Sequence, residues 1–407
     1  VRKSYFNGCT DKMQAVFQSY AGIHPNLRGT FLDASFAFLY NSDIMLFGGI
    51  HCMNVQPCAP SSGRNYYIDF LRGLAAINII LIHTAFWSGS EYVPVWFQSL
   101  TLLIDVPLFF FIAGWAFSYS SSFEKSLLNV FRTHLKYTVF LLIYTVVIFA
   151  FHRAEFSPAS ALNTFFFVFP KENLLLPVVD SSFWFLPVYY CVSIAVSGVI
   201  VLVSRLSTNQ NGAFRILRLL LALVFFLFAF LSLQHSANGS LQTVLFYCLF
   251  FLLGYLTKDW FVPKLRYLLA ALGVFVIGLL AFIVLSGRNG FDLQSAKFPP
   301  NLQYLFASLI GVSIALYVKR FAKIASSNIF VWVGKNALYF YMAQGVASSL
   351  LFFIIPKLPT LPWPALFAVC AVINLVGTAL LALLLKTISD PLERLFNRII
   401  AVKNKTA

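Results

Sequence analysis

The chain has 407 residues, of which 59% are hydrophobic and only 11% charged, and its mean hydropathy is +0.80. A soluble domain carries roughly 25% charged residues, so this composition excludes a water-soluble globular protein and indicates lipid as the solvent. The formal net charge of +15 does not indicate a nucleic-acid partner, because no basic cluster is interleaved with aromatic residues.

The first 63 residues differ from the rest of the chain. They mix polar, glycine and aromatic residues without a long apolar run and without a signal-peptide pattern. We expect either a cytoplasmic extension or upstream sequence from an over-long start, and we favour the second. Cys52 and Cys58, with His51 beside them, lack the spacing of zinc ligands, so no metal site is predicted.

Apolar runs of about 17 to 25 residues recur from Tyr66 onward, which is the length that crosses a bilayer as a helix. The sequence therefore predicts an all-α, polytopic membrane protein with about ten transmembrane helices. We expect an N-terminal extension at 1–63, a transmembrane domain at 64–395 and a cytoplasmic tail at 396–407. The predicted spans are 66–88, 96–119, 135–152, 183–204, 215–233, 240–256, 266–285, 301–318, 336–355 and 363–386.

The distribution of basic residues predicts the orientation. If the N-terminus is inside, Lys and Arg concentrate in every inside loop and in the C-terminal tail, as expected for cytoplasmic segments. Both termini should therefore face the cytoplasm. The outside loops then hold only Arg153, Lys171, Arg288, Lys297 and Lys357.

Ionisable side chains inside a membrane are costly, so they indicate function. His83 is the histidine that lies well inside a predicted span, and Asp105 is the carboxylate that does so. Asp69 lies at the inner end of the first span, close to Arg72. These four residues are the first candidates for a functional site.

Arg72 and His83 are eleven residues apart, which is three helical turns plus about 20°. We therefore expect both side chains on one face of the first helix, separated by roughly 16 Å along its axis. Arg72 should lie near the cytoplasmic leaflet and His83 beyond the midplane, whereas Asn78 should face another way. A catalytic role requires a route between the two; taken alone, each also fits a snorkelling anchor or an interhelical hydrogen bond.

Five segments, in order along the chain, resemble the acyltransferase 3 family, whose membrane-bound members modify bacterial surface carbohydrates. The resemblance covers about residues 66 to 395. This chain has Ala113 where the family has Ser, and Gln344 where the family often has His, so no second histidine is assigned. The matching segments are Asp69-Phe70-Leu71-Arg72-Gly73 with His83, Asp105 to Gly114, Phe131-Arg132 with Lys136, Phe183-Trp184-Phe185-Leu186, and Gly334 to Tyr341.

The resemblance implies an acyltransferase of the cytoplasmic (inner) membrane. A cytoplasmic acyl-CoA, most often acetyl-CoA, would donate the acyl group to a carbohydrate hydroxyl on the outer side. His83 would act either as the general base or as a covalent carrier of the acyl group, with Asp105 as a nearby carboxylate. Arg72 would bind a donor phosphate through its guanidinium, oriented by Asp69.

Most other matching positions have two interpretations each. Arg132 and Lys136 either reach the phosphates of CoA or anchor the helix on the basic side of the membrane. Lys335 and Asn336, with Gly334, are candidates to cap the ninth helix and face the donor. Trp184 either stacks against the acceptor sugar or belongs to an interfacial aromatic belt.

A transporter or exporter of a polysaccharide or small solute is the main alternative, and a non-catalytic membrane scaffold is a third class. Transporters often contain paired broken helices in two related halves, and the sequence indicates no such pair. The choice between acetyl and succinyl groups and the identity of the acceptor stay open.

Overall fold

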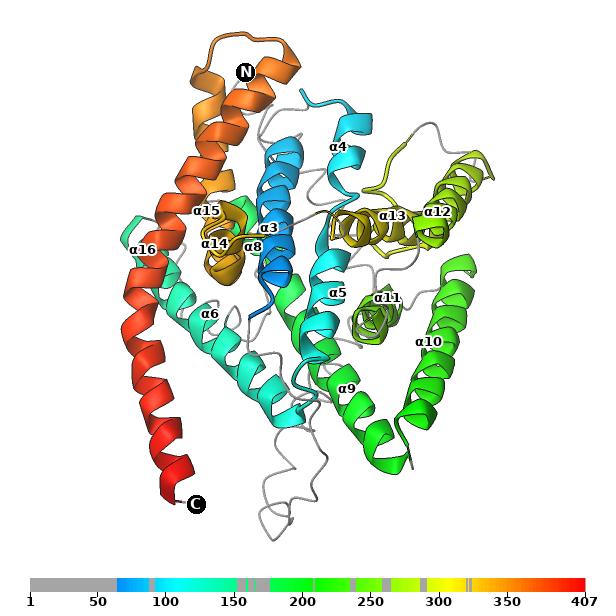
Figure 1. Cartoon of the computed structure of the whole chain (residues 1–407). Coiled ribbons are helices and arrows are strands. Elements are labelled where there is room, and N and C mark those ends of the chain that lie inside the picture. Colours follow the sequence, from blue (N-terminus) through cyan, green and yellow to red (C-terminus); the bar gives the residue numbers. More distant parts are fainter. Residues whose placement is uncertain are drawn as a thin grey trace. The chain divides into compact units, whose positions relative to one another are not determined.

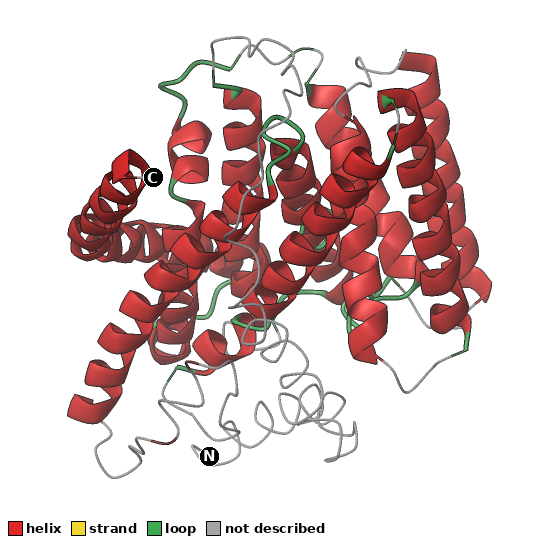
Figure 2. Ribbon diagram, turned by 90° about the horizontal axis from the view of Figure 1, so that it is seen from below, coloured by secondary structure: helices red, strands yellow, loops and turns green. Residues whose placement is uncertain are grey.

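The computed structural model describes residues 64–87, 92–151, 159, 165, 176–207, 209–234, 239–257, 265–285, 291–319, 321 and 324–406. The chain divides into two units, Val1–Asn65 with Ser236–Asn238, and Tyr66–His235 with Gly239–Ala407. All described helices belong to the second unit, and no strand occurs among the described residues (Figure 2). Cys52, Cys58 and His51 lie outside the described residues, so the expectation for the first 63 residues is untested.

The predicted apolar runs form helices. Nine described segments are long and apolar enough to cross a membrane, while the run at 301–318 forms a shorter apolar helix of 17 residues. The all-α, polytopic class is therefore confirmed, and the count of ten stays a prediction. The helices are α3 (Tyr66–Trp87), α4 (Val95–Thr101), α5 (Val106–Phe117), α6 (Phe123–Phe151), α8 (Pro177–Ser182), α9 (Phe185–Leu206), α10 (Gln210–Leu233), α11 (Gly239–Leu256), α12 (Leu265–Leu285), α13 (Leu302–Val318), α14 (Ile329–Lys335), α15 (Ala337–Ile354), the 3-10 turn η3 (Ile355–Lys357) and α16 (Trp363–Thr406) (Figure 1).

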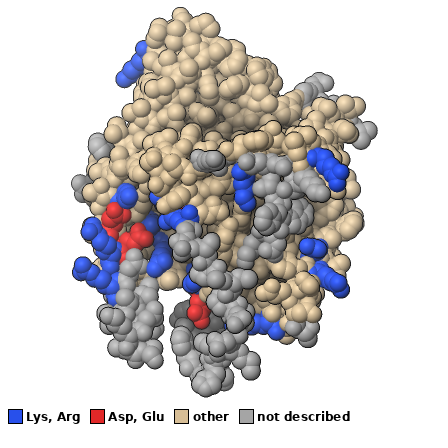
Figure 3. Space-filling view, viewed as in Figure 1, with Lys and Arg blue, Asp and Glu red and all other residues tan. Residues whose placement is uncertain are grey.

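Basic side chains are unevenly spread over the face drawn in Figure 3. They lie mainly over its middle and lower parts, whereas the top carries few. In the same view the α9–α10 junction, with Arg205 before it and Arg215 after it, lies at the bottom (Figure 1). Such a bias is typical of a cytoplasmic side, but the orientation of the termini stays a prediction.

The second predicted span is not one continuous helix. It breaks into α4 and α5 at Leu102–Asp105, because Pro107 has no backbone N–H and suits only the first turn of a helix. Irregular backbone at membrane depth must be buried and hydrogen-bonded by the protein. Asn78 does this: its Nδ2 donates to the carbonyl of Thr101 at 2.7 Å and to that of Ile104.

Pairs of glycines let two pairs of helices touch backbone to backbone. A Cβ on Gly73 of α3 would overlap the carbonyl oxygen of Phe330 in α14, and a Cβ on Gly334 would overlap that of Asp69. Gly114 of α5 and Gly254 of α11 face each other's helices in the same reciprocal way. Small residues commonly permit such close approach between membrane helices, and here they fix the helices that carry Arg72, His83 and Asp105.

Helices α6 and α16 are longer than predicted. α6 begins at Phe123, about three turns before the expected start of its span. α16 extends over 44 residues through the expected boundary at 395 and reaches Thr406. The predicted tail at 396–407 is therefore largely a continuation of the last helix.

Replacing Gly254 with alanine should destabilise the folded protein by about 1–3 kcal/mol, because the new methyl group forces α5 and α11 apart. Thermal unfolding in detergent measures the effect. Gly273→Ala is the matched control, since no atom lies within 4 Å of a Cβ at that position. Equal melting temperatures for the two variants would contradict this account of the packing.

Candidate functional site

Arg72 and Asp69 form an ion pair at one end of α3. Arg72 Nη1 lies 3.1 Å from Asp69 Oδ1, and the Asp69 side chain is almost completely buried while that of Arg72 is partly exposed. The contact has the geometry expected for a carboxylate that orients the guanidinium. The donor-binding role of both residues stays a prediction.

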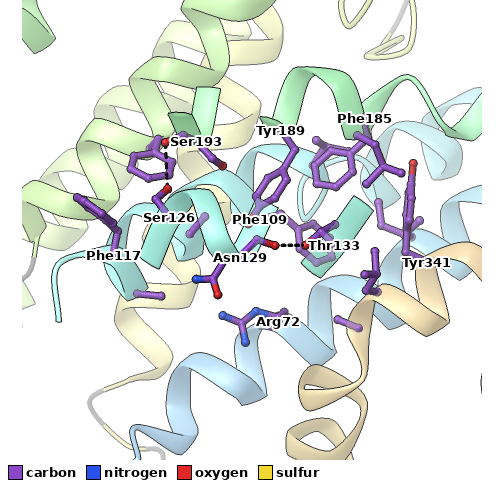
Figure 4. A pocket seen from close by; sticks show the side chains of 18 of the residues that line it. Arg72, Phe109, Phe117, Ser126, Asn129, Thr133, Phe185, Tyr189, Ser193 and Tyr341 are labelled. Carbon is purple, nitrogen blue, oxygen red and sulfur yellow. Dashed lines mark hydrogen bonds between the residues drawn. The ribbon is translucent and has the colours of Figure 1, made fainter. Parts of the chain in front are cut away.

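Arg72 also lines a cavity of about 280 Å³ between α3, α5, α6, α9, α11 and α15. Figure 4 shows Ser126 and Ser193 at one end of it, with Arg72 and Asn129 pointing toward each other in the middle. Most of the labelled aromatic side chains, among them Phe109, Phe185 and Tyr341, lie toward the other end. Polar side chains thus gather toward one end of the cavity and aromatic ones toward the other.

A second polar group lies at the break in the second span. Asp105 Oδ2 receives a contact from Lys297 Nζ at 2.6 Å and a hydrogen bond from the Tyr304 hydroxyl, also at 2.6 Å. The Asp105 side chain is completely buried, and that of Lys297 is only 8% exposed. An ion pair buried this deeply loses the hydration of both charges, so it need not stabilise the fold. Ionisable groups at such a position indicate a functional site instead.

His83 lies close enough to this ion pair to interact electrostatically with both Lys297 and Asp105. Its Nδ1 is buried and has no hydrogen-bond partner among the described residues. Ile79, one helical turn before His83, lines the cavity that contains Arg72, although His83 itself is not among the lining residues. The cavity therefore extends along α3 from Arg72 to within one turn of the imidazole.

Trp184 and Phe185 mark the boundary between the cavity and the ion pair. Phe185 lines the cavity, whereas Lys297 Nζ lies 5.8 Å from the centre of the Trp184 ring. Trp184 also packs against Phe298 and Tyr247, with ring centres 5.2 and 6.0 Å away. Trp184 thus contacts residues around the ion pair, and its role in substrate binding stays a prediction.

Arg132 and Lys136 do not line the cavity, although Thr133 of the same helix does. They line a small separate space between α6 and α16. There Lys136 Nζ lies 2.9 Å from Glu393 Oε2, so its charge is already paired. These contacts favour a role in holding the helices together over a role in donor binding.

Lys335 and Asn336 lie where α14 meets α15. Lys335 is exposed, with its Nζ 5.2 Å from the centre of the Tyr66 ring. The Asn336 side chain donates to the Trp332 carbonyl at 2.8 Å and does not cap α15, contrary to expectation. Their neighbours Ala337 and Leu338, in contrast, do line the cavity.

Sequence reasoning missed Lys297 and Tyr304 in the ion-pair cluster and Ser126 and Asn129 in the cavity. The sequence alone predicts an ordinary loop position for Lys297. The available signal was that this lysine lies in a loop with few basic residues and precedes Phe298 and two prolines. The other three are uncharged, and their chemical type alone carried no signal. Among the described residues, no three His, Cys, Asp or Glu side chains gather where they could hold a metal.

Comparison with known proteins identifies the family. No curated relative and no solved structure matches the chain. A family model described as an acyltransferase domain, that of acyltransferase 3, matches residues 65–383 and so includes every helix that contributes to the cavity and the ion-pair cluster. The chain is therefore a multi-pass membrane protein that belongs to the acyltransferase 3 family.

Proposed function

We propose that the protein transfers an acetyl group from cytoplasmic acetyl-CoA to a hydroxyl of a carbohydrate on the outer side of the cytoplasmic membrane. The observation that carries the proposal is the continuity along α3. A cavity containing Arg72 ends one turn from His83, which lies beside a buried ion pair. Helix α3 therefore connects the cavity that contains Arg72 with a group able to accept a proton.

The polar half of the cavity supports a phosphorylated donor. Arg72 supplies a guanidinium held by Asp69, and its planar fork suits phosphate or pyrophosphate oxygens. Ser126, Asn129 and Ser193 offer hydrogen bonds along the same space. The amides of a pantetheine arm would find partners there, with the thioester directed toward the apolar end.

The apolar half supports a small uncharged acyl group. Phe109, Phe185 and Tyr341, which Figure 4 shows toward that end, carry no positive charge. Lys297 does not line the cavity and is already paired with Asp105. A succinyl group would therefore place its free carboxylate in an apolar space without a partner, which is costly.

The surroundings of His83 support a carbohydrate acceptor. The Trp184 ring lies against Lys297 and Phe298, and indole faces are suitable surfaces for sugar rings. A sugar hydroxyl beside His83 could pass its proton to the imidazole while its oxygen attacks the thioester carbon. The carbon–sulfur bond then breaks, the thiolate of CoA leaves, and it takes up the proton. In the covalent alternative, the imidazole nitrogen attacks the thioester carbon and displaces the CoA thiolate. The acceptor hydroxyl then attacks the acyl-imidazole, the carbon–nitrogen bond breaks to free the imidazole, and the hydroxyl proton passes to the thiolate.

His83→Ala should lower transfer from acetyl-CoA by at least 100-fold, because both routes need the imidazole. Arg72→Ala should mainly raise the KM for acetyl-CoA, because it removes a phosphate contact. Purified protein in liposomes with radiolabelled acetyl-CoA measures both, and Arg266→Ala, an exposed arginine on α12, is the control. Solute flux without any acyl transfer or acetyl-CoA hydrolysis would support the transporter instead.

The wild-type protein should favour acetyl-CoA over succinyl-CoA by about 100-fold or more in kcat/KM, because an unpaired buried carboxylate costs a few kcal/mol. Phe109→Ala should extend use to hexanoyl-CoA, because it enlarges the apolar end of the cavity. Phe225→Ala, which alters an exposed side chain on α10, is the matched control. An unchanged hexanoyl-to-acetyl ratio in Phe109→Ala would show that the acyl group binds elsewhere.

A further inference from the structure

The segment 291–300, between α12 and α13, carries an ionic side chain into the helical body. Its Lys297 contacts Asp105 Oδ2 inside the protein, and Leu293 and Ala296 are completely buried. This segment therefore does not behave like an ordinary solvated loop between two membrane helices.

Polar contacts hold the segment at both ends without using the ion pair. Ser99 of α4 donates to the Phe291 carbonyl at 2.6 Å and accepts the Leu293 N–H at 3.0 Å. Gln242 of α11 donates to the Pro300 carbonyl at 2.7 Å. These contacts hold both ends of the segment independently of the ion pair.

The ion pair instead determines the orientation of the Asp105 side chain. Asp105 is the N-cap residue of α5, yet its side chain does not cap that helix. Oδ2 accepts from both Lys297 and Tyr304, whereas Oδ1 is buried and has no hydrogen-bond partner among the described residues. The carboxylate is thus held through one oxygen, within electrostatic range of His83.

We propose that Lys297 is a positioning residue for acyl transfer, which holds Asp105 in a fixed orientation near His83 while the imidazole accepts the acceptor's proton. Without Lys297, Oδ2 would keep only the hydrogen bond from Tyr304, and no ion pair would fix the orientation of the carboxylate. This inference rests on the proposed function. It adds Lys297, which lies outside the five segments that carry the family resemblance.

The test compares Lys297→Met, Lys297→Arg and the double variant Asp105→Asn with Lys297→Met in liposomes containing acetyl-CoA. Lys297→Met should lower kcat at least tenfold with the KM for acetyl-CoA changed less than twofold, since Lys297 does not line the donor cavity. Lys297→Arg keeps the positive charge and should keep more activity than Lys297→Met. Lys357→Met, which alters an exposed lysine in another loop, should behave as wild type.

The double variant separates a positioning role from a structural one. It removes both charges, so its melting temperature should recover relative to Lys297→Met, while its activity should stay low. Activity that recovers together with stability would overturn the proposal, as would full activity in Lys297→Met. If Lys297→Met does not fold, the double variant and Lys297→Arg carry the test. A wild-type protein without any acyl chemistry would instead overturn the proposed function.

Discussion

A carboxylate inside a lipid-embedded helical bundle needs a positive partner, and the candidate site depends on how Asp105 obtains one. The second span breaks at Asp105, Asn78 satisfies the carbonyls freed by the break, and Lys297 enters from a neighbouring loop to pair with the carboxylate. Each of these arrangements costs free energy when considered alone. Together they hold the Asp105 carboxylate in a fixed orientation within electrostatic range of His83.

Helix α3 connects the two parts of the site. Its polar end carries Arg72 and the cavity, and its His83 lies beside the ion pair. Phe185 and Trp184 separate the cavity from the cluster while belonging to the same short stretch of chain. Because Arg72 and His83 lie on the same helix, α3 sets the distance between them, and close packing through Gly73 and Gly334 holds α3 against α14.

The sequence predicted the elements that depend on local composition. Long apolar runs showed where the helices lie, and the spacing of Arg72 and His83 placed them on one helix with Asp69 beside the arginine. What could not be predicted depends on contacts between distant segments. Lys297 and Asp105 are far apart in sequence, and only the packing of α13 and its preceding loop against the break joins them. The break itself was missed because Pro107 lies in a run whose hydropathy is that of a continuous span.

The central claim is that donor and acceptor approach one imidazole from opposite sides of the membrane. Liposomes with protein in a single known orientation test it, with acetyl-CoA supplied on one side and an oligosaccharide acceptor on the other. The account predicts acetyl ester only when acetyl-CoA is on the side of the α9–α10 junction and the acceptor is opposite. Equal ester formation with both substrates on the same side would contradict it.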